Sequence, residues 1–139
     1  MSFSKLKDLI FRRAKGLCEY CKSPANISTQ PFVVEHIVPK SKGGETTDKN
    51  LALSCQGCNN HKYNKTSGFD SVSSQEMELF HPRAQNWNEN FSWSDELTEV
   101  LGKTAAGRVT VNELKLNRQE LKNLRNLLAD AGKHPPDED

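Results

Sequence analysis

The chain lacks any run of about 18 apolar residues, which is the length that a membrane-spanning helix requires. Its first residues also lack the long apolar stretch of a secretory signal. Hydrophobic residues make up only 35% of the 139 residues, and aromatic residues only 7%. These shortages exclude a large apolar core and a membrane protein. We therefore expect a soluble, cytoplasmic protein with one modest core that needs a helper element.

Cysteine is scarce as well, but its four residues form two pairs with none left over, Cys18 with Cys21 and Cys55 with Cys58. A gap of two residues lets both thiolates of a pair reach one ion, and four thiolates at about 2.3 Å form a closed tetrahedral zinc site. Two disulfides or a thiol redox protein are the alternatives, but paired spacing in a cytoplasmic chain favours metal. We therefore predict one structural zinc ion, whose binding free energy replaces missing core.

Net charge is low, at +1 for the whole chain, but the two halves differ. Residues 1–65 carry eleven Lys and Arg against five Asp and Glu, whereas residues 66–139 carry eight against thirteen. A basic half is typical of a surface that faces nucleic acid, and an uneven solvated surface is the alternative. The candidates for contact with a phosphate backbone are Arg12, Arg13, Lys15, Lys40 and Lys42.

The spacing of apolar residues predicts an α+β protein. An amphipathic helix is expected over residues 3–15, followed by short strands over 32–34 and 51–53. A helix is expected to start after the second cysteine pair, over residues 59–65. Two strands and a helix would thus enclose the polar residues that lie between the cysteine pairs.

The second half of the chain differs from the first half in its sequence pattern. Three aromatic residues, Trp87, Phe91 and Trp93, are expected to form a satellite core. A hairpin is predicted over residues 91–101, and helices over 104–116 and 118–131, with Leu121, Leu124 and Leu128 as the buried stripe of the last one. We predict a zinc-stapled core over 1–68, a mainly helical extension packed on it over 69–133, and a disordered tail over 134–139.

The polar residues around the cysteine pairs have the chemistry that phosphodiester hydrolysis requires. The reaction needs a base for water and a cation for the charge on phosphate. A neutral histidine suits the first task, while carboxylate and amide oxygens suit a hard cation such as magnesium or manganese. The candidates for these tasks are Glu35, His36, Asn50, Asn59, His61 and Lys62.

The order of these residues resembles the HNH endonuclease family with paired cysteines. The likeness lies in F-x-x-E-H-I-x-P-x-S-x-G-G over 32–44, in N-L over 50–51 and in C-N-x-x-K over 58–62, within a segment of about residues 12–65. It implies a ββα-metal, treble-clef-like core that hydrolyses phosphodiester bonds, with DNA as the expected substrate. A looser likeness to a bacterial subfamily continues in L-F-H-P-R over 79–83.

By this resemblance His36 is the general base, and Glu35 and Asn59 hold one catalytic divalent cation, magnesium or manganese, with nickel or zinc as alternatives. The family more often has aspartate where Glu35 stands, so the carboxylate arm is one methylene longer but keeps its charge. Adjacent residues of a regular strand point to opposite sides, so a twist at the strand end is needed for Glu35 and His36 to share a site. Asn50 is expected to brace the loop and to orient the histidine. A buried Glu-His pair and, for Asn59, a helix N-cap are the structural alternatives.

His61 and Lys62 follow Asn59 on the expected helix. We expect Lys62 to contact a scissile or flanking phosphate. His61 is a candidate third metal ligand, with an exposed surface histidine as the alternative. The resulting prediction is a metal-dependent endonuclease; a zinc-dependent nucleic-acid-binding or interaction module without cleavage is the alternative, and a homodimer is left open.

Overall fold

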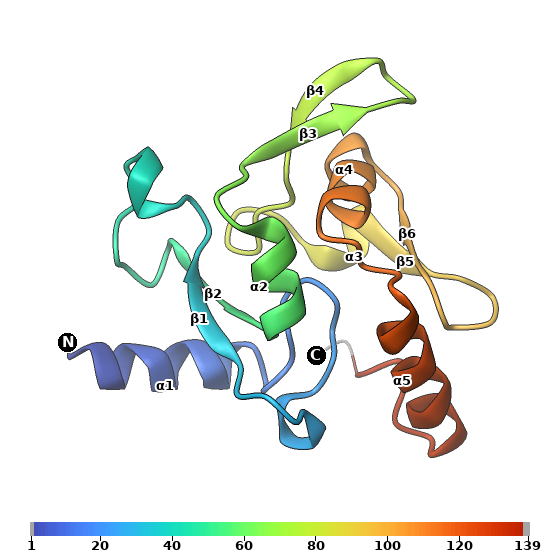
Figure 1. Cartoon of the computed structure of the whole chain (residues 1–139). Coiled ribbons are helices and arrows are strands. Elements are labelled where there is room, and N and C mark those ends of the chain that lie inside the picture. Colours follow the sequence, from blue (N-terminus) through green and yellow to red (C-terminus); the bar gives the residue numbers. More distant parts are fainter. Residues whose placement is uncertain (1, 138–139) are drawn as a thin grey trace.

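The computed structural model describes residues 2–137 and combines short helices with three two-stranded antiparallel sheets, which confirms the α+β class (Figure 1). Within this part of the chain, no helix is long and apolar enough to cross a membrane. The helices are α1 (Phe3–Arg13), η1 (Ala25–Ile27), η2 (Lys40–Lys42), α2 (Gln56–Lys62), α3 (Trp87–Asn90), α4 (Ala105–Glu113) and α5 (Gln119–Asp130). The strands are β1 (Val33–His36), β2 (Leu51–Ser54), β3 (Ser67–Asp70), β4 (Gln75–Glu78), β5 (Phe91–Trp93) and β6 (Val100–Gly102).

Helix α1 forms where the helical spacing predicts it. Ser2 caps its start, because the side-chain oxygen accepts a hydrogen bond from the Lys5 backbone N–H at 3.3 Å. Ile10 is fully buried in a small cluster with Leu51 and Leu53 of β2. Burial of one such side chain contributes about 1.5–3 kcal/mol, so this contact attaches α1 to the hairpin.

Strands β1 and β2 form the hairpin that carries most of the candidate site. His36 is the last residue of β1 and pairs with Leu51 of β2. The predicted strands are confirmed, but β1 extends two residues beyond residue 34, so both Glu35 and His36 lie within it. The prediction of a helix starting at Asn59 is wrong: α2 starts at Gln56, because the Cys55 sulfur accepts from the Cys58 backbone N–H at 3.4 Å and caps the helix.

The hairpin of β3 and β4 is absent from our sequence-based prediction. Its strands read S-G-F-D and Q-E-M-E and bury only Gly68 and Asp70 fully, so the alternation of apolar and polar residues is too weak to indicate a strand. The hairpin projects from the rest of the chain in Figure 1, and its strands contact α4. The expected boundary after Gly68 falls inside β3.

The aromatic residues of the second half belong to the main core and not to a satellite. Trp87 and Phe91 lie in the same buried cluster as the four cysteines. Their ring centroids are 5.1 Å apart, and the Trp87 indole N–H donates to the Tyr20 carbonyl at 2.9 Å. The predicted hairpin and both predicted helices are present as β5, β6, α4 and α5. The buried side of α5 contains Arg125 in addition to Leu121, whereas Leu124 and Leu128 are only half-buried.

His134, the first residue of the predicted disordered tail, packs against the rest of the chain. This residue is 8% exposed, and its Nε2 lies 2.8 Å from the Leu97 carbonyl oxygen. Its ring lies edge-on to the Trp93 ring, with 4.4 Å between the two ring centroids. The tail has no aliphatic residue to bury, but an imidazole combines an apolar ring with a polar atom and therefore fits a site that offers both. The last two residues of the expected tail, 138 and 139, lie outside the described part of the chain.

Candidate metal and nuclease site

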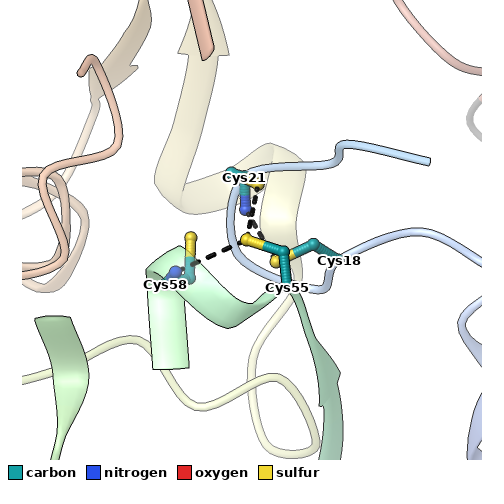
Figure 2. A group of neighbouring side chains, drawn as sticks. All are labelled: Cys18, Cys21, Cys55 and Cys58. Atoms are coloured by element: carbon teal, nitrogen blue, oxygen red, sulfur yellow. Dashed lines mark hydrogen bonds between the residues drawn. The ribbon is translucent and has the colours of Figure 1, made fainter. Parts of the chain in front are cut away.

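The four cysteines meet in one buried cluster. All four sulfurs lie within 4.8 Å of one another, and Figure 2 shows them directed at a common centre. The sulfurs of Cys21 and Cys55 are 3.7 Å apart. Four sulfurs at about 2.3 Å from zinc would be separated by about 3.8 Å, so the cluster has the dimensions of a tetrahedral zinc site. The predicted clustering is thus confirmed.

Each cysteine pair is a knuckle, residues 18–21 and residues 55–58, in which a backbone N–H points at a sulfur. In the first knuckle the Cys21 N–H donates to the Cys18 sulfur at 3.5 Å, and in the second the Cys58 N–H donates to the Cys55 sulfur at 3.4 Å. Donors of this kind stabilise thiolates over thiols. Both knuckles are therefore preorganised to bind a cation.

Arg118 extends the cluster from the far end of the chain, and sequence reasoning missed it. Its Nη1 and Nη2 both donate to the Cys58 sulfur at 3.6 Å, and Nη2 also donates to the Cys55 sulfur at 3.6 Å. Burial alone would lower the pKa of this guanidinium, but the nearby cysteine sulfurs raise it above its ordinary value. Four thiolates around a divalent ion keep a net charge of −2, which a buried guanidinium offsets in part. No spacing rule relates residue 118 to the knuckles.

Glu35 is the buried acidic residue of the candidate nuclease site. Its Oε1 accepts a hydrogen bond from the Tyr20 hydroxyl at 2.9 Å and lies 3.3 Å from the Lys62 ammonium nitrogen. Its Oε2 is buried and has no hydrogen-bond partner among the described residues. Burial raises the pKa of this carboxyl, and the contacts with Lys62 and Tyr20 oppose the shift. Oε1 is therefore fixed in place, whereas Oε2 can still accept a hydrogen bond.

Lys62 is directed into the protein and not at solvent. It is 2% exposed, and its Nζ donates to the carbonyl oxygens of Ile37 at 2.8 Å and of His36 at 3.3 Å. These bonds join α2 to the end of β1. In this arrangement the ammonium holds the strand that carries the candidate base, instead of presenting the exposed charge that contact with a phosphate would need.

His36 is half-buried, and its Nε2 lies 2.8 Å from the Thr46 hydroxyl in the loop between β1 and β2. It thus contacts that loop, whereas Glu35 contacts Tyr20 and α2, so the two side chains diverge. Burial lowers the pKa of the His36 imidazole, and the charges of Lys40 and Lys62 lower it further. The ring is therefore neutral at neutral pH, as a general base must be.

Asn50 makes three hydrogen bonds across the same loop. Its Oδ1 accepts from the Val38 N–H at 2.9 Å, and its Nδ2 donates to the carbonyls of Val38 at 3.0 Å and Glu45 at 2.9 Å. The close approach depends on Gly44, where an added Cβ would lie 1.7 Å from the Val38 oxygen. The amide is fully occupied within the loop that also contains Thr46.

Asn59 lies within α2. It is not the N-cap of this helix, which was its structural alternative, because Cys55 occupies that position. Asn59 comes three positions before Lys62, which is close to one helical turn, so the two residues lie on the same side of α2. His61 is two residues from Asn59, about 200° around the helix, and does not share this side.

A cavity of about 480 Å³ adjoins this site and is lined by Ile37, Val38, Lys62 and His81, among others. Backbone N–H groups of Arg83 and Ala84 both donate to Nδ1 of His81 at 3.2 Å. The extension therefore reaches the immediate surroundings of the candidate site, which the cysteine spacing alone did not indicate.

The two strands and the helix between and beside the cysteine pairs form a small ββα unit with a buried four-cysteine cluster that is consistent with zinc binding. Residues 18–65 match the family model described as HNH endonuclease, so this segment is similar to an HNH endonuclease domain. The match covers both knuckles and all candidate site residues from Glu35 to Lys62. Members of this nuclease family are typically phosphodiester hydrolases, and the family implies a nucleic-acid substrate. No curated protein and no solved structure matched the chain.

Proposed function

We propose that the protein is a metal-dependent endonuclease that hydrolyses phosphodiester bonds in DNA, with zinc in the cysteine cluster as a structural ion. The observation that carries the proposal is the state of Glu35. Its carboxylate is buried and held through Oε1, while Oε2 has no hydrogen-bond partner among residues 2–137. A buried acceptor without a partner costs about 1–3 kcal/mol, which a bound cation would repay.

The donor set fits a hard divalent cation. In this proposal Glu35 supplies a carboxylate oxygen, and Asn59, three positions before Lys62 on α2, supplies an amide oxygen. When bound, magnesium or manganese supplies neutralisation of the charge that develops on the phosphate and on the leaving oxygen. We leave His61 out of this ligand set because of its different helical side.

His36 is the proposed general base, which takes the proton from the attacking water. The neutral ring is ready to accept it, since burial and two nearby lysines lower the pKa of the imidazole. The Thr46 hydroxyl contacts Nε2 and fixes the ring plane. Asn50 holds the loop that carries Thr46, and we assign it a positioning role.

Lys62 is also a positioning residue in this proposal. Its bonds to the His36 and Ile37 carbonyls connect the end of β1 to α2, and its charge opposes the rise in the pKa of the Glu35 carboxyl that burial causes. The buried Lys62 ammonium thus contacts both the proposed metal ligand Glu35 and the backbone of the proposed base His36.

Cleavage of supercoiled plasmid tests the proposal. Purified protein is treated with EDTA, its zinc content is checked by elemental analysis, and magnesium, manganese and nickel are then titrated separately. Nicked or linear product that requires added metal is expected. His36→Ala should lower the rate by at least about 100-fold, because a positioned base contributes roughly 10²–10⁴-fold. Asn59→Ala should also lower the rate, because it removes a proposed ligand of the catalytic cation.

Asn60→Ala is the matched control for Asn59→Ala, since Asn60 is exposed on the same helix. It should cleave at the wild-type rate. Absence of cleavage with every metal, despite intact zinc and an unchanged melting temperature, would refute the nuclease and support a nucleic-acid-binding module instead. Wild-type rates in His36→Ala would refute the role of that residue alone.

A further inference from the structure

A second cleft lies where the two parts of the chain meet, along the outer edge of β2. It has a volume of about 660 Å³, and its cationic side chains come from four separate segments. We call it the basic cleft and define it by Arg13 at the end of α1, Lys22 after the first knuckle, Lys49 before β2, and Arg83 from the extension.

The charges of the basic cleft are not balanced. Against four cationic groups stands the one carboxylate of Glu19, which pairs with the Arg83 guanidinium through Oε1 and accepts from the Leu53 N–H through Oε2 at 2.8 Å. An excess of three positive charges in one concave surface attracts anions, because a cleft focuses the field of its charges.

Arg83 and Arg13 are each fixed in the basic cleft. Nη2 of Arg13 donates to the carbonyls of Asp48 at 2.8 Å and Leu51 at 3.1 Å. Nε of Arg83 is buried and has no hydrogen-bond partner among the described residues. Burial and the nearby charge of Arg13 lower the pKa of Arg83 to about 10. The fold thus places two guanidinium groups on one cleft, and an anion bound there would offset their mutual repulsion.

The basic cleft is connected to the candidate nuclease site through the residues that flank the start of β2. Lys49 directly precedes Asn50, which braces the loop of His36, and Leu51 is the register partner of His36. Lys49 is exposed and has no hydrogen-bond or ion-pair partner within residues 2–137. Its ammonium is therefore available to a ligand that also reaches the loop between β1 and β2.

We propose that the basic cleft is a phosphate-binding subsite for the backbone of the nucleic-acid substrate, built jointly by the HNH domain and the C-terminal extension. This inference rests on the proposed function, because it assigns the extension a share in holding the same substrate. Arginine and lysine donors recognise phosphate oxygens without reading bases, so the subsite adds affinity but no sequence preference.

Salt-dependent binding of labelled duplex DNA tests the subsite, in a His36→Ala background that does not cleave. The slope of log K against log salt should become shallower by about 0.9 in Lys49→Gln and by about 1.8 in Lys22→Gln/Lys49→Gln. Equivalently, the affinity lost between about 50 and 200 mM salt should shrink by about threefold for each phosphate contact removed. Lys122→Gln on α5, which removes the same charge away from the basic cleft, should keep the parent slope.

Melting temperatures equal to that of the parent show that the variants fold. Slopes of the Lys49 variants equal to that of Lys122→Gln would overturn the subsite and leave the nuclease proposal intact, because the parent would still bind. A parent that binds neither duplex nor single-stranded DNA would overturn both.

Discussion

Arg118 donates from both Nη1 and Nη2 to the sulfur of Cys58, at 3.6 Å each, across 60 residues of sequence. Gly57 permits this approach, since a Cβ at that position would lie 2.4 Å from Nη2. The guanidinium therefore supports the metal site electrostatically and attaches the start of α5 to the second knuckle.

We expect Arg118→Ala to weaken zinc retention by about 10–100-fold, the usual effect of removing a partner of a metal ligand. Zinc release to a chromogenic chelator measures the effect. Arg12→Ala, which removes an equal charge from an exposed site on α1, should release zinc at the wild-type rate. Cys55→Ala gives the upper reference, because it removes a ligand and should lose both the zinc and the cooperative melting transition. Unchanged retention in Arg118→Ala would show that the contact is incidental.

The Asp70 carboxylate makes stability depend on acid pH. It accepts from Nε of Arg108 at 2.9 Å and Nη2 at 3.0 Å, and from the Ser73 N–H at 3.0 Å, which connects the β3–β4 hairpin to α4. The hydrogen bonds from Arg108 and then from Ser73 hold the pKa of this carboxyl far below its ordinary value. A depressed carboxyl pKa stabilises the fold above the unfolded pKa of about 3.9, and this contribution is lost as the pH falls below it.

Asp70→Asn should therefore melt at a lower temperature than wild type at pH 7, and the difference should shrink towards pH 3. Thermal unfolding followed by circular dichroism across this range measures both. Asp95→Asn, at an exposed turn, is the control and should show no difference at either pH. A difference in melting temperature that stays constant at all pH values would mean that the shape of the side chain, and not its ionisation, explains the effect of the substitution.

The cysteine cluster and the order of β1, β2 and α2 were predictable from sequence, because ligand spacing and short-range periodicity are local signals. The role of Arg118 was not, since its contacts depend on how α5 packs. Lys62 shows a similar limit: a lysine on a polar helix is expected at the surface, and only the acceptors around it explain its burial. The β3–β4 hairpin escaped prediction because it is stabilised by the Asp70–Arg108 pair more than by an apolar face.

His134 should stabilise the fold at neutral pH. Its bond to the Leu97 carbonyl and its edge-on contact with Trp93 together contribute about 1–2 kcal/mol, so His134→Ala should melt several degrees lower. Burial lowers the pKa of this imidazole, the Leu97 bond opposes the shift and the charge of Arg125 adds to it. The folded protein therefore binds a proton less readily than the unfolded chain, and the contribution is lost as the pH falls below about 6.5.

The stability gap between wild type and His134→Ala should accordingly be larger at pH 8 than at pH 5. Urea unfolding at the two pH values measures it, with Lys133→Ala as the control at the exposed neighbouring position. Equal stability of His134→Ala and wild type at pH 8 would contradict an ordered role for this histidine.

The buried pair of Lys62 and Glu35 should be strongly coupled in stability. Both side chains are almost fully buried, at 3% and 6% exposed, with 3.3 Å between Nζ and Oε1. Lys62→Met leaves a buried carboxylate without its counter-charge and should lower the free energy of unfolding by about 3–5 kcal/mol. Lys62→Met/Glu35→Gln should lower it by clearly less than the sum of its single variants.

Lys65→Met is the matched control. Its 3.1 Å pair with Glu113 involves a side chain that is 41% exposed, so the pair should contribute less than about 1 kcal/mol. Urea unfolding without added divalent metal gives all these values; additive losses would mean that Lys62 acts only through its bonds to the backbone carbonyls of β1.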